Sequence, residues 1–284
     1  MEIILAKSAG FCFGVQRAVE AVYEHLEKGE KIYTYGPIIH NDVVVGELAA
    51  KGVRVLDGID DISDIEEGTV VIRSHGIPKK TDEILAASRL NIVDATCPFV
   101  KKIHRIVEQR SLAGDRIVVI GSRKHPEVMG IIGWCADPSL ATVIENADEA
   151  HDFECDKDEK ITVVSQTTSS LCKFKELVEI LQGKGYNVNV VNTICNATDM
   201  RQEEARDIAS KVDMMIVIGD RKSSNTQKLY EICSRECNCT EFVQTSDELE
   251  TDPQRSLRRV GITAGASTPK KIIEEVQNYV RINF

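Results

Sequence analysis

Two patterns of hydrophobic and polar residues alternate along the chain. Short apolar runs rich in β-branched residues predict buried strands at residues 3–5, 70–72, 117–120, 161–164 and 214–218. Between such runs, apolar residues recur every three or four positions, as in helices that bury one face; the clearest stretches are 15–26, 100–107 and 171–181. Strands that alternate with helices predict an α/β fold with parallel sheets built from βαβ units.

Three parts of the chain repeat the same features in the same order. Each has a cysteine where a strand passes into a helix, and 24 residues later a glycine that ends the next strand; the pairs are Cys12 with Gly36, Cys97 with Gly121, and Cys195 with Gly219. The glycines open segments that read Gly-x-x-x-(His/Ser)-x-(Asp/Glu/Asn), and small polar residues follow at a further strand end in each part, at 73–78, 165–169 and 264–269. The repeats predict three similar domains, at 1–95, 96–193 and 194–284, which pack against one another because each is small for an independent core.

Charge and composition narrow the possible functions. The 284 residues include 35 Lys and Arg and 45 Asp and Glu, so the formal net charge is −10. An acidic chain is a poor binder of nucleic acid, whose phosphates need a cationic face. No apolar run approaches the roughly 18–20 residues that cross a bilayer, and the first residues do not resemble a signal peptide. We therefore expect a cytoplasmic protein that binds neither nucleic acid nor membranes.

The nine cysteines are numerous for a protein of a reducing compartment, where a disulfide framework is not expected. Open parallel sheets bind ligands beyond the carboxyl ends of their strands, so three domains that face a common centre would gather Cys12, Cys97 and Cys195 in one pocket. Three thiolates without a fourth equivalent indicate a metal centre with an open coordination position, holding either zinc or an iron–sulfur cluster. The alternative is that these cysteines are small packing residues.

The other six cysteines carry weaker signals. Cys233, Cys237 and Cys239 lie close together, as in part of a zinc motif, but no fourth ligand stands at a usual spacing, so packing is the preferred interpretation. The remaining three have no motif around them, and we expect structural roles for Cys135, Cys155 and Cys172.

Histidines, a glutamate and hydroxyl-bearing residues occupy the repeated strand ends. His40, His75 and His125 are candidates for anion binding or proton transfer, with turn capping as the alternative. Glu127 either offsets a helix dipole or donates a proton with a pKa raised by burial. Further side chains could cap helices or contact phosphate oxygens: Ser223, Ser224, Asn225, Ser267 and Thr268. Three other histidines have no motif around them: His25, His104 and His151.

Taken together, these residues resemble the motifs of the 4-hydroxy-3-methylbut-2-enyl diphosphate reductases, the last enzymes of the methylerythritol phosphate route to isoprenoid precursors. The resemblance spans essentially the whole chain. It rests on the segments 9–15, 36–41, 73–76, 94–98, 125–127, 166–168, 193–195, 223–225 and 266–269. No single segment is specific, but their combination is.

The resemblance implies a fold, a cofactor and a reaction. It implies three similar small α/β domains in a pseudo-threefold arrangement around a [4Fe–4S] cluster, which Cys12, Cys97 and Cys195 hold while one iron stays open for the substrate's hydroxyl group. Two electrons and two protons then remove this hydroxyl as water and yield isopentenyl or dimethylallyl diphosphate. The electrons are expected from a small carrier such as ferredoxin or flavodoxin, and we expect a monomer.

The resemblance also implies roles for individual residues. Glu127 would deliver protons, and His125 and Thr167 would complete the catalytic hydrogen-bond network. The expected substrate contacts are His40, His75, His125, Thr167, Thr168, Ser223, Ser224, Asn225 and Ser267, with Thr268 as a further candidate.

Two other functions stay open on the sequence alone. One is a different three-cysteine cluster enzyme, such as a quinolinate-synthase-like dehydratase, which would need no external electrons. The other is a zinc-binding or cluster-binding protein without catalysis. Iron and sulfide content, followed by consumption of reductant with the substrate, separates the three.

Overall fold

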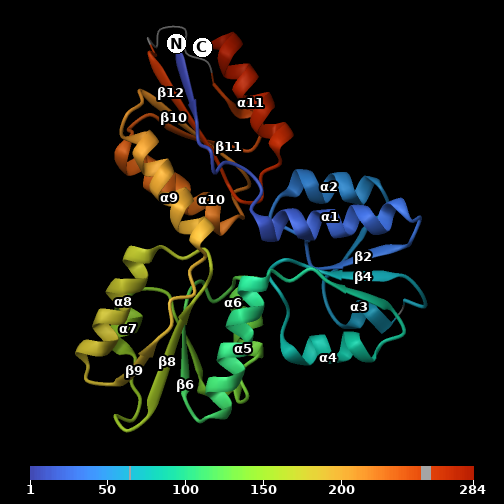
Figure 1. The fold of residues 1–284 in the computed structure, drawn as a ribbon, viewed down its shortest axis with the longest axis vertical. Helices are drawn as coiled ribbons and strands as arrows, with labels where there is room; N and C mark the ends of the chain where they lie inside the picture. The colour runs from blue at the N-terminus through green and yellow to red at the C-terminus, as the bar shows by residue number, and fades with distance from the viewer. Residues whose placement is uncertain (64, 251–256) are drawn as a thin grey trace. The chain divides into compact units, whose positions relative to one another are not determined.

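The computed structural model of the chain describes residues 1–63, 65–250 and 257–284. Within these residues the strands form three four-stranded sheets, each wholly parallel and accompanied by helices, which confirms the predicted α/β class (Figure 1). Every predicted strand is present. The described helices include none that is both long and apolar enough to span a membrane.

The three sheets share one strand order. The first is β3-β2-β4-β5, with β2 at Ile32–Tyr35, β3 at Arg54–Leu56, β4 at Thr69–Ile72 and β5 at Asn91–Asp94. The second is β7-β6-β8-β9, with β6 at Arg116–Ile120, β7 at Ala141–Ile144, β8 at Lys160–Ser165 and β9 at Asn187–Val190. The third is β11-β10-β12-β1, with β10 at Met214–Ile218, β11 at Thr240–Val243, β12 at Arg259–Ala264 and β1 at Glu2–Leu5.

Helices connect these strands. Those up to residue 112 are α1 (Phe13–Glu27), α2 (Asp42–Ala50), α3 (Asp60–Ser63), α4 (Lys79–Ala87) and α5 (Pro98–Leu112). Those after it are α6 (Pro126–Gly133), α7 (Ala147–Asp152), α8 (Leu171–Gly183), α9 (Asn196–Ala209), α10 (Ser224–Glu236) and α11 (Lys270–Asn283), and short 3-10 turns lie at Pro138–Leu140 and Ser246–Glu248. Two of these helices begin with a proline at the first position, where its missing N–H has no helical partner to lose: α5 and α6.

The strand order shows that the repeat is cyclic. In each sheet the last strand named above ends shortly before a cysteine: β5 before Cys97, β9 before Cys195 and β1 before Cys12. The first strand of the chain therefore pairs with β12 of the third sheet, and not with the strands that follow it. It is an edge strand with Leu5 38% exposed, so the prediction that residues 3–5 are buried is wrong. The predicted boundaries of the three domains stay a prediction.

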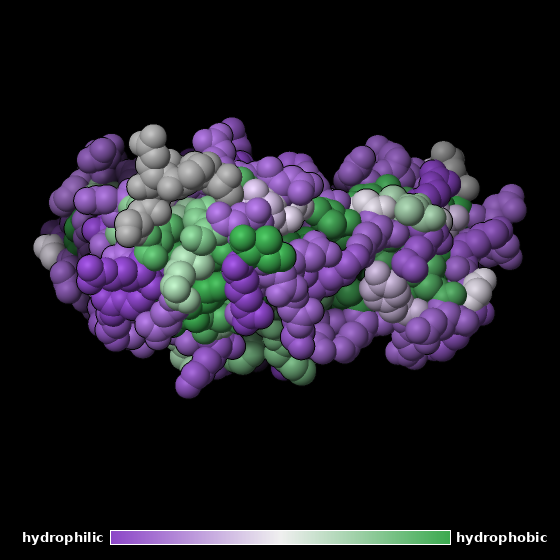
Figure 2. Space-filling view, turned by 90° about the horizontal axis from the view of Figure 1, so that it is seen from above, coloured by the Kyte–Doolittle hydropathy of each residue, from purple (hydrophilic) through white to green (hydrophobic). Residues whose placement is uncertain are grey.

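By their internal contacts the residues form two compact units. Unit 1 comprises Met1–Gln16, Ile39–Ala50 and Asn196–Phe284 and contains the sheet β11-β10-β12-β1; unit 2 comprises Arg17–Ile38 and Lys51–Cys195 and contains the other two sheets. In Figure 2 most of the visible surface is hydrophilic and the green, hydrophobic areas are small patches.

The core of unit 1 illustrates why its strands are apolar throughout. All five residues of β10 are buried, and successive side chains point to opposite faces. Met214, Ile216 and Ile218 pack in a cluster with the apolar stripe of α11, whereas Met215 and Val217 pack in a cluster with residues of α9 and α10. A parallel sheet covered on both faces needs such continuous apolar runs.

Candidate active site

The three repeated cysteines occupy equivalent places in their sheets. Each follows the strand at one edge and directly precedes a helix: α1 after Cys12, α5 after Cys97 and α9 after Cys195. The backbone N–H of each cysteine donates to the loop that follows the neighbouring strand, and the bonds are Cys12 to Ala266 O at 3.2 Å, Cys97 to Ser74 O at 3.0 Å and Cys195 to Thr167 O at 3.0 Å. The local fold thus places the three thiols alike.

These three thiols have the properties of metal ligands. None of the nine cysteines forms a disulfide, and Cys12, Cys97 and Cys195 are each partly exposed directly before a helix. Cys233 differs from them, because burial raises the pKa of its thiol to about 12 and it packs in an apolar cluster. Three accessible soft donors fit a thiolate-bound metal or an iron–sulfur cluster.

The other cysteines lie mainly in the core. Cys237 is buried beside Cys233 and Cys239 packs against the same cluster, so the packing interpretation of this trio is confirmed. Cys135 is buried in a cluster of unit 2 and Cys155 packs against another. Cys172 is exposed near the start of α8, so the structural role expected for it is wrong.

Glu127 and Thr167 form the most distinctive pair of unit 2. Glu127 lies in the first turn of α6, with 2% of its surface exposed, and Thr167 follows β8. The backbone N–H of Thr167 donates to Glu127 Oε1 at 2.6 Å and the Thr167 hydroxyl donates to Oε2 at 2.8 Å. Burial raises the pKa of Glu127 to about 7, although both bonds from Thr167 act to lower it. Because this pKa lies near neutrality, Glu127 is able to donate and accept a proton.

His125 links the pair to the rest of the strand-end loops. Its Nδ1 accepts a 3.1 Å hydrogen bond from the backbone N–H of Glu127, so it caps α6 and leaves the proton of a neutral ring on Nε2. Its ring also meets the edge of the His75 ring, with centroids 5.4 Å apart. The capping alternative is therefore confirmed for His125.

Gln166 is a residue of this region that sequence reasoning left without a role. Its side-chain N–H donates to Thr168 Oγ1 at 2.9 Å, and its Oε1 accepts from the backbone N–H of Ser122 at 3.1 Å. It therefore ties the loop after β8 to the loop after β6. A Cβ on Gly121 would lie 2.8 Å from Gln166 Cβ, which explains the glycine at this repeated position.

The residues expected to bind a diphosphate in unit 1 lie around the start of α10. Ser223 is the N-cap of that helix and its hydroxyl accepts from Thr226 N at 3.4 Å, so it does act as a cap. Asn225 is 3% exposed, and neither its amide nitrogen nor its amide oxygen has a hydrogen-bond partner among the residues that the structure describes. A buried amide is costly without partners, so Asn225 stays a candidate for binding a polar ligand.

His40 and the loop after β12 complete the unit 1 part. The Ser267 hydroxyl donates to the backbone oxygen of His40 at 2.8 Å and so fixes the segment before α2. The Thr268 hydroxyl is fully buried and donates to Ile218 O at 3.1 Å, which commits it to the backbone. Both hydroxyls therefore donate to backbone oxygens of unit 1.

Asp220 is a second residue without a sequence-based role. It is 3% exposed, and its Oδ2 accepts from the backbone N–H of Asp42 at 2.9 Å while its Oδ1 accepts from Lys222 N at 2.7 Å. The carboxylate therefore joins the start of α2 to the turn before α10. Its position directly after Gly219 gave no hint of the contact with Asp42, because Asp42 lies 178 residues away in the sequence.

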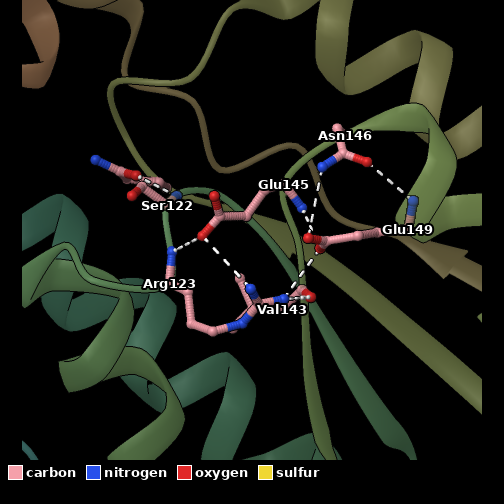
Figure 3. A network of polar contacts seen from close by, with 7 residues as sticks. Ser122, Arg123, Val143, Glu145, Asn146 and Glu149 are labelled. Atoms are coloured by element: carbon pink, nitrogen blue, oxygen red, sulfur yellow. Dashed lines mark hydrogen bonds and ion pairs between the residues drawn. The ribbon is translucent and has the colours of Figure 1, made fainter.

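Arg123 belongs to one of the repeated segments, but its hydrogen bonds are made elsewhere. It stands beside Ser122 in the repeated segment, but its guanidinium donates to Glu149 at 3.0 Å and to Val143 O at 3.1 Å, and its backbone N–H donates to Glu145 (Figure 3). Asn146 Oδ1 in turn accepts from Glu149 N at 2.9 Å and caps α7. This network at the surface neutralises Arg123.

The three histidines without motifs have ordinary structural surroundings. His25 Nδ1 lies 2.8 Å from Glu30 Oε2, and His151 lies at the end of α7. His104 is buried in α5 and stacks on Trp134 with ring centroids 5.2 Å apart. Burial lowers the pKa of His104 to about 4, so its ring is neutral.

Comparison with known proteins now identifies the family. The LytB protein family matches residues 3–281, nearly the whole chain. The chain belongs to the LytB family. Among curated members, the 4-hydroxy-3-methylbut-2-enyl diphosphate reductase of Thermoanaerobacter sp. (strain X514) is 43% identical over 284 residues, with 99% of this chain and 97% of that protein covered. The protein of the same name from Geotalea uraniireducens is 46% identical over 276 residues, covering 97% of this chain and 95% of its own.

Two solved structures of reductases have a similar fold. The E-1-hydroxy-2-methyl-but-2-enyl-4-diphosphate reductase of Plasmodium falciparum is 30% identical, with a TM-score of 0.90 over 99% of this chain and 87% of that one. An (E)-4-hydroxy-3-methyl-but-2-enyl diphosphate reductase, described as the terminal enzyme of the non-mevalonate pathway, is 42% identical, with a TM-score of 0.70 over 99% of this chain and 100% of that one.

Proposed function

We propose that this LytB protein reduces 4-hydroxy-3-methylbut-2-enyl diphosphate to isopentenyl and dimethylallyl diphosphate. The observation that supports it most directly is the buried Glu127, whose pKa of about 7 and bonds to Thr167 suit a proton donor. Curated LytB relatives that align with 97% and more of the chain bear the name of this reductase. The reaction breaks the carbon–oxygen bond of the allylic hydroxyl, consumes two electrons and two protons, and releases water.

Cys12, Cys97 and Cys195 are the proposed ligands of a [4Fe–4S] cluster. When bound, such a cluster supplies electrons one at a time and offers an open iron as a Lewis acid. The chain contributes three equivalent loops, in which each cysteine N–H is bonded to a neighbouring strand end. A small carrier such as ferredoxin or flavodoxin is the proposed electron donor.

Glu127 and Thr167 form the proposed path for protons. When Glu127 is protonated, its acidic hydrogen can be donated to Thr167 Oγ1, which lies 2.8 Å from Oε2. The threonine hydroxyl then has its own hydrogen available for the leaving hydroxyl group of the substrate. A buried acid is thereby connected to a ligand that it need not touch.

The diphosphate is the proposed ligand of the polar groups at the strand ends. In unit 1 the start of α10 offers Asn225, Ser223 and Ser224 together with a positive dipole end. Ser267 and His40 lie on the same unit and are joined by a hydrogen bond. His75, His125 and Thr168 are the proposed contacts from unit 2. A monomer in the cytoplasm is the proposed working form.

Iron and sulfide analysis of anaerobically purified protein, followed by turnover with a one-electron reductant, tests the function. We expect a coloured protein with iron and acid-labile sulfide that consumes two reducing equivalents per substrate molecule. A colourless protein with zinc would contradict the cluster. A coloured protein that leaves the substrate unchanged with reductant present would contradict the reaction and favour a dehydratase or a binding protein.

A further inference from the structure

The loop that leads to Cys12 is held by two side chains of α9. Glu204 accepts on Oε1 from the backbone N–H of Lys7 at 2.8 Å, and on Oε2 from the backbone N–H of Ser8 at 2.9 Å and from the Ser8 hydroxyl at 2.5 Å. Arg201 donates from Nε to Ser8 O at 2.9 Å and from Nη2 to Ser8 O at 2.5 Å and Gly10 O at 2.7 Å. The carboxylate of Glu204 therefore accepts hydrogen bonds from this short loop, and the guanidinium of Arg201 donates hydrogen bonds to it.

We call Arg201 and Glu204, with their bonds to residues 7, 8 and 10, the clamp. Its hydrogen bonds are strong, and few other side chains could replace them. Arg201 is 3% exposed, and a buried guanidinium is tolerated only where its N–H groups find acceptors. Burial on its own would raise the pKa of Glu204, but the bonds from Ser8 and Lys7 bring it below its ordinary value. Both side chains are thus ionised, and charge-assisted hydrogen bonds are shorter and stronger than neutral ones.

Helix α9, which carries the clamp, is also joined directly to a second proposed cluster ligand, Cys195. Helix α9 begins at Asn196, directly after Cys195, and Arg201 and Glu204 lie within its next turns. Cys12 follows Gly10 by two residues. One helix therefore starts at one proposed cluster ligand and holds the loop of another.

The same arrangement recurs one repeat further on. Helix α1 begins directly after Cys12, and its Arg17 donates to Asp94 O and to Thr96 O, both at 2.9 Å. These two oxygens belong to the loop that leads to Cys97. The loop before Cys195 is held by a hydroxyl instead: Thr193 Oγ1 donates to Ser165 O at 2.6 Å and accepts from Ser165 N at 2.7 Å. Because the arginine contact recurs at an equivalent loop, local packing around Ser8 does not account for it.

We propose that Arg201 and Glu204, with Arg17 in the next repeat, are positioning residues that keep the cysteine loops in the conformation that retains the cluster. The inference rests on the proposed function, because it assumes the [4Fe–4S] cluster. A thiolate on a loosely held loop dissociates more readily, so loss of the clamp should speed the release of iron. Residues that orient metal ligands typically account for about 10–100-fold in metal affinity.

Matched variants on α9 separate a positioning role from a general structural one. Arg201→Met and Glu204→Gln remove the clamp, and Arg201→Lys keeps the charge while losing the fork of donors. Glu203→Gln and Arg206→Met are the controls, since both residues are exposed neighbours on the same helix. Arg17→Met tests the second loop with the first intact.

The measurement is the rate at which the anaerobically reconstituted proteins release iron to a chelator, well below their unfolding temperatures, with the electron paramagnetic resonance spectrum of the reduced state and far-ultraviolet circular dichroism alongside. We expect the clamp variants to release iron about tenfold faster or more, with a shifted resonance signal and an unchanged circular dichroism spectrum. Arg201→Lys should be intermediate, and the controls should match the wild type.

Each remaining outcome overturns a defined part of the argument. Folded clamp variants with the wild-type release rate and spectrum, in a wild-type protein that does carry iron and sulfide, overturn the clamp and leave the proposed function standing. A wild-type protein without iron and sulfide overturns both. If Arg201→Met does not fold, the comparison of Glu204→Gln with Glu203→Gln decides the matter in the same way.

Discussion

Burial of the Glu127 side chain affects both its pKa and its contribution to the stability of the protein. Its carboxyl group lies in the first turn of α6, as a charge that offsets the helix dipole would, yet 2% of its surface is exposed. Burial raises its pKa to about 7, so the neutral acid is well populated at neutral pH. The surroundings of the side chain therefore support the second of the two interpretations of Glu127, a proton donor with a pKa raised by burial.

Replacing Glu127 by Gln should lower turnover by about 100-fold or more, because an amide cannot donate a proton as an acid does and general acid catalysis contributes about that much. In the wild type, turnover should fall as pH rises through about 7, since the acid form is the donor. Steady-state rates from pH 5.5 to 9 measure both effects. Iron content should stay at the wild-type value.

Glu83→Gln is the control for this change, since Glu83 is exposed on α4 and should leave the rate and the pH profile unchanged. Thr167→Ser should retain most of the activity and Thr167→Val should lose it, because only serine keeps the hydroxyl that connects Glu127 with a ligand. Equal activity of the two Thr167 variants would contradict the relay.

The same pKa predicts a dependence of stability on pH. The folded-state pKa of Glu127 lies above the value of 4.5 expected for the unfolded chain, so between about pH 4.5 and 7 the folded state holds a proton that the unfolded state has released. The contribution is fully present below the unfolded-state pKa and is lost as pH rises through 7, amounting to about 3 kcal/mol. Urea unfolding of wild type and Glu127→Gln across this range should show the variant gaining relative stability with pH. A difference in the free energy of unfolding between wild type and Glu127→Gln that stayed constant with pH would contradict this prediction.

At the scale of elements, the start of α10 combines a capped helix with the Asn225 amide, which has no hydrogen-bond partner in the described part of the chain. Asn225→Leu should leave the ligand-free protein at least as stable, because it removes two buried polar atoms that have no hydrogen bond. It should weaken diphosphate binding about tenfold, since a hydrogen bond to a charged group contributes roughly 1.5–3 kcal/mol. Thermal unfolding with and without inorganic diphosphate measures both quantities.

Asn278→Leu on α11 is the matched control, because Asn278 is exposed and should leave the thermal shift by diphosphate intact. If diphosphate raised the unfolding temperature of Asn225→Leu as much as that of the wild type, Asn225 would not be part of the diphosphate site.

The glycines that end the repeated strands are fixed by space and by backbone angle. Gly219 has φ of +151°, and a Cβ there would lie 2.8 Å from Thr226 Oγ1 and 2.9 Å from Thr268 Oγ1. Gly219→Ala should therefore lower the free energy of unfolding, by about 1–3 kcal/mol. Gly46→Ala in α2 should raise it by about 0.5–1 kcal/mol, as nothing lies within 4 Å of the new Cβ. Urea unfolding measures both, and effects of the same sign would contradict the argument.

At the scale of the whole molecule, the chain termini interrupt one of three equivalent βαβ units. Helices α4 and α8 connect neighbouring parallel strands, β4 with β5 and β8 with β9, and α11 follows β12 in the same way. Its expected partner strand is β1, at the other end of the chain. Figure 1 shows the two termini at the same end of unit 1, as a parallel neighbour joined by a crossover helix requires.

A circular permutant should accordingly retain the fold. If a short Gly/Ser linker joins Phe284 to Met1 and new ends are opened between the exposed Lys157 and Asp158, every strand and helix stays intact. We expect a wild-type circular dichroism spectrum and an unfolding temperature within a few degrees of the wild type. A permutant opened inside β10, between Ile216 and Val217, should not fold. Failure of the first permutant would contradict the cyclic repeat.

Much of the fold and part of the site were predictable from the chain. The alternation of β-branched runs with helical spacing predicted the strands and the main helices, and the spacing from cysteine to glycine placed Cys97 and Gly121 at strand ends that the structure confirms. Such signals are readable because each arises within one element and its adjoining turn. The motif around Glu127 could be found, but its contact with Thr167 could not, because the two residues are 40 positions apart.

The sequence by itself determined that the chain is built from three similar α/β parts, each with a cysteine at a strand end. Tertiary structure alone decided that β1 completes the third sheet, that Glu127 is buried against Thr167, and that Arg201 and Glu204 hold the loop of Cys12. The physical reason is that periodicity and turn residues act over a few positions, whereas strand pairing, burial and long-range hydrogen bonds depend on which distant surfaces fit together. Ser8 and Glu204 lie 196 positions apart in the chain, and only the tertiary fold brings them into contact.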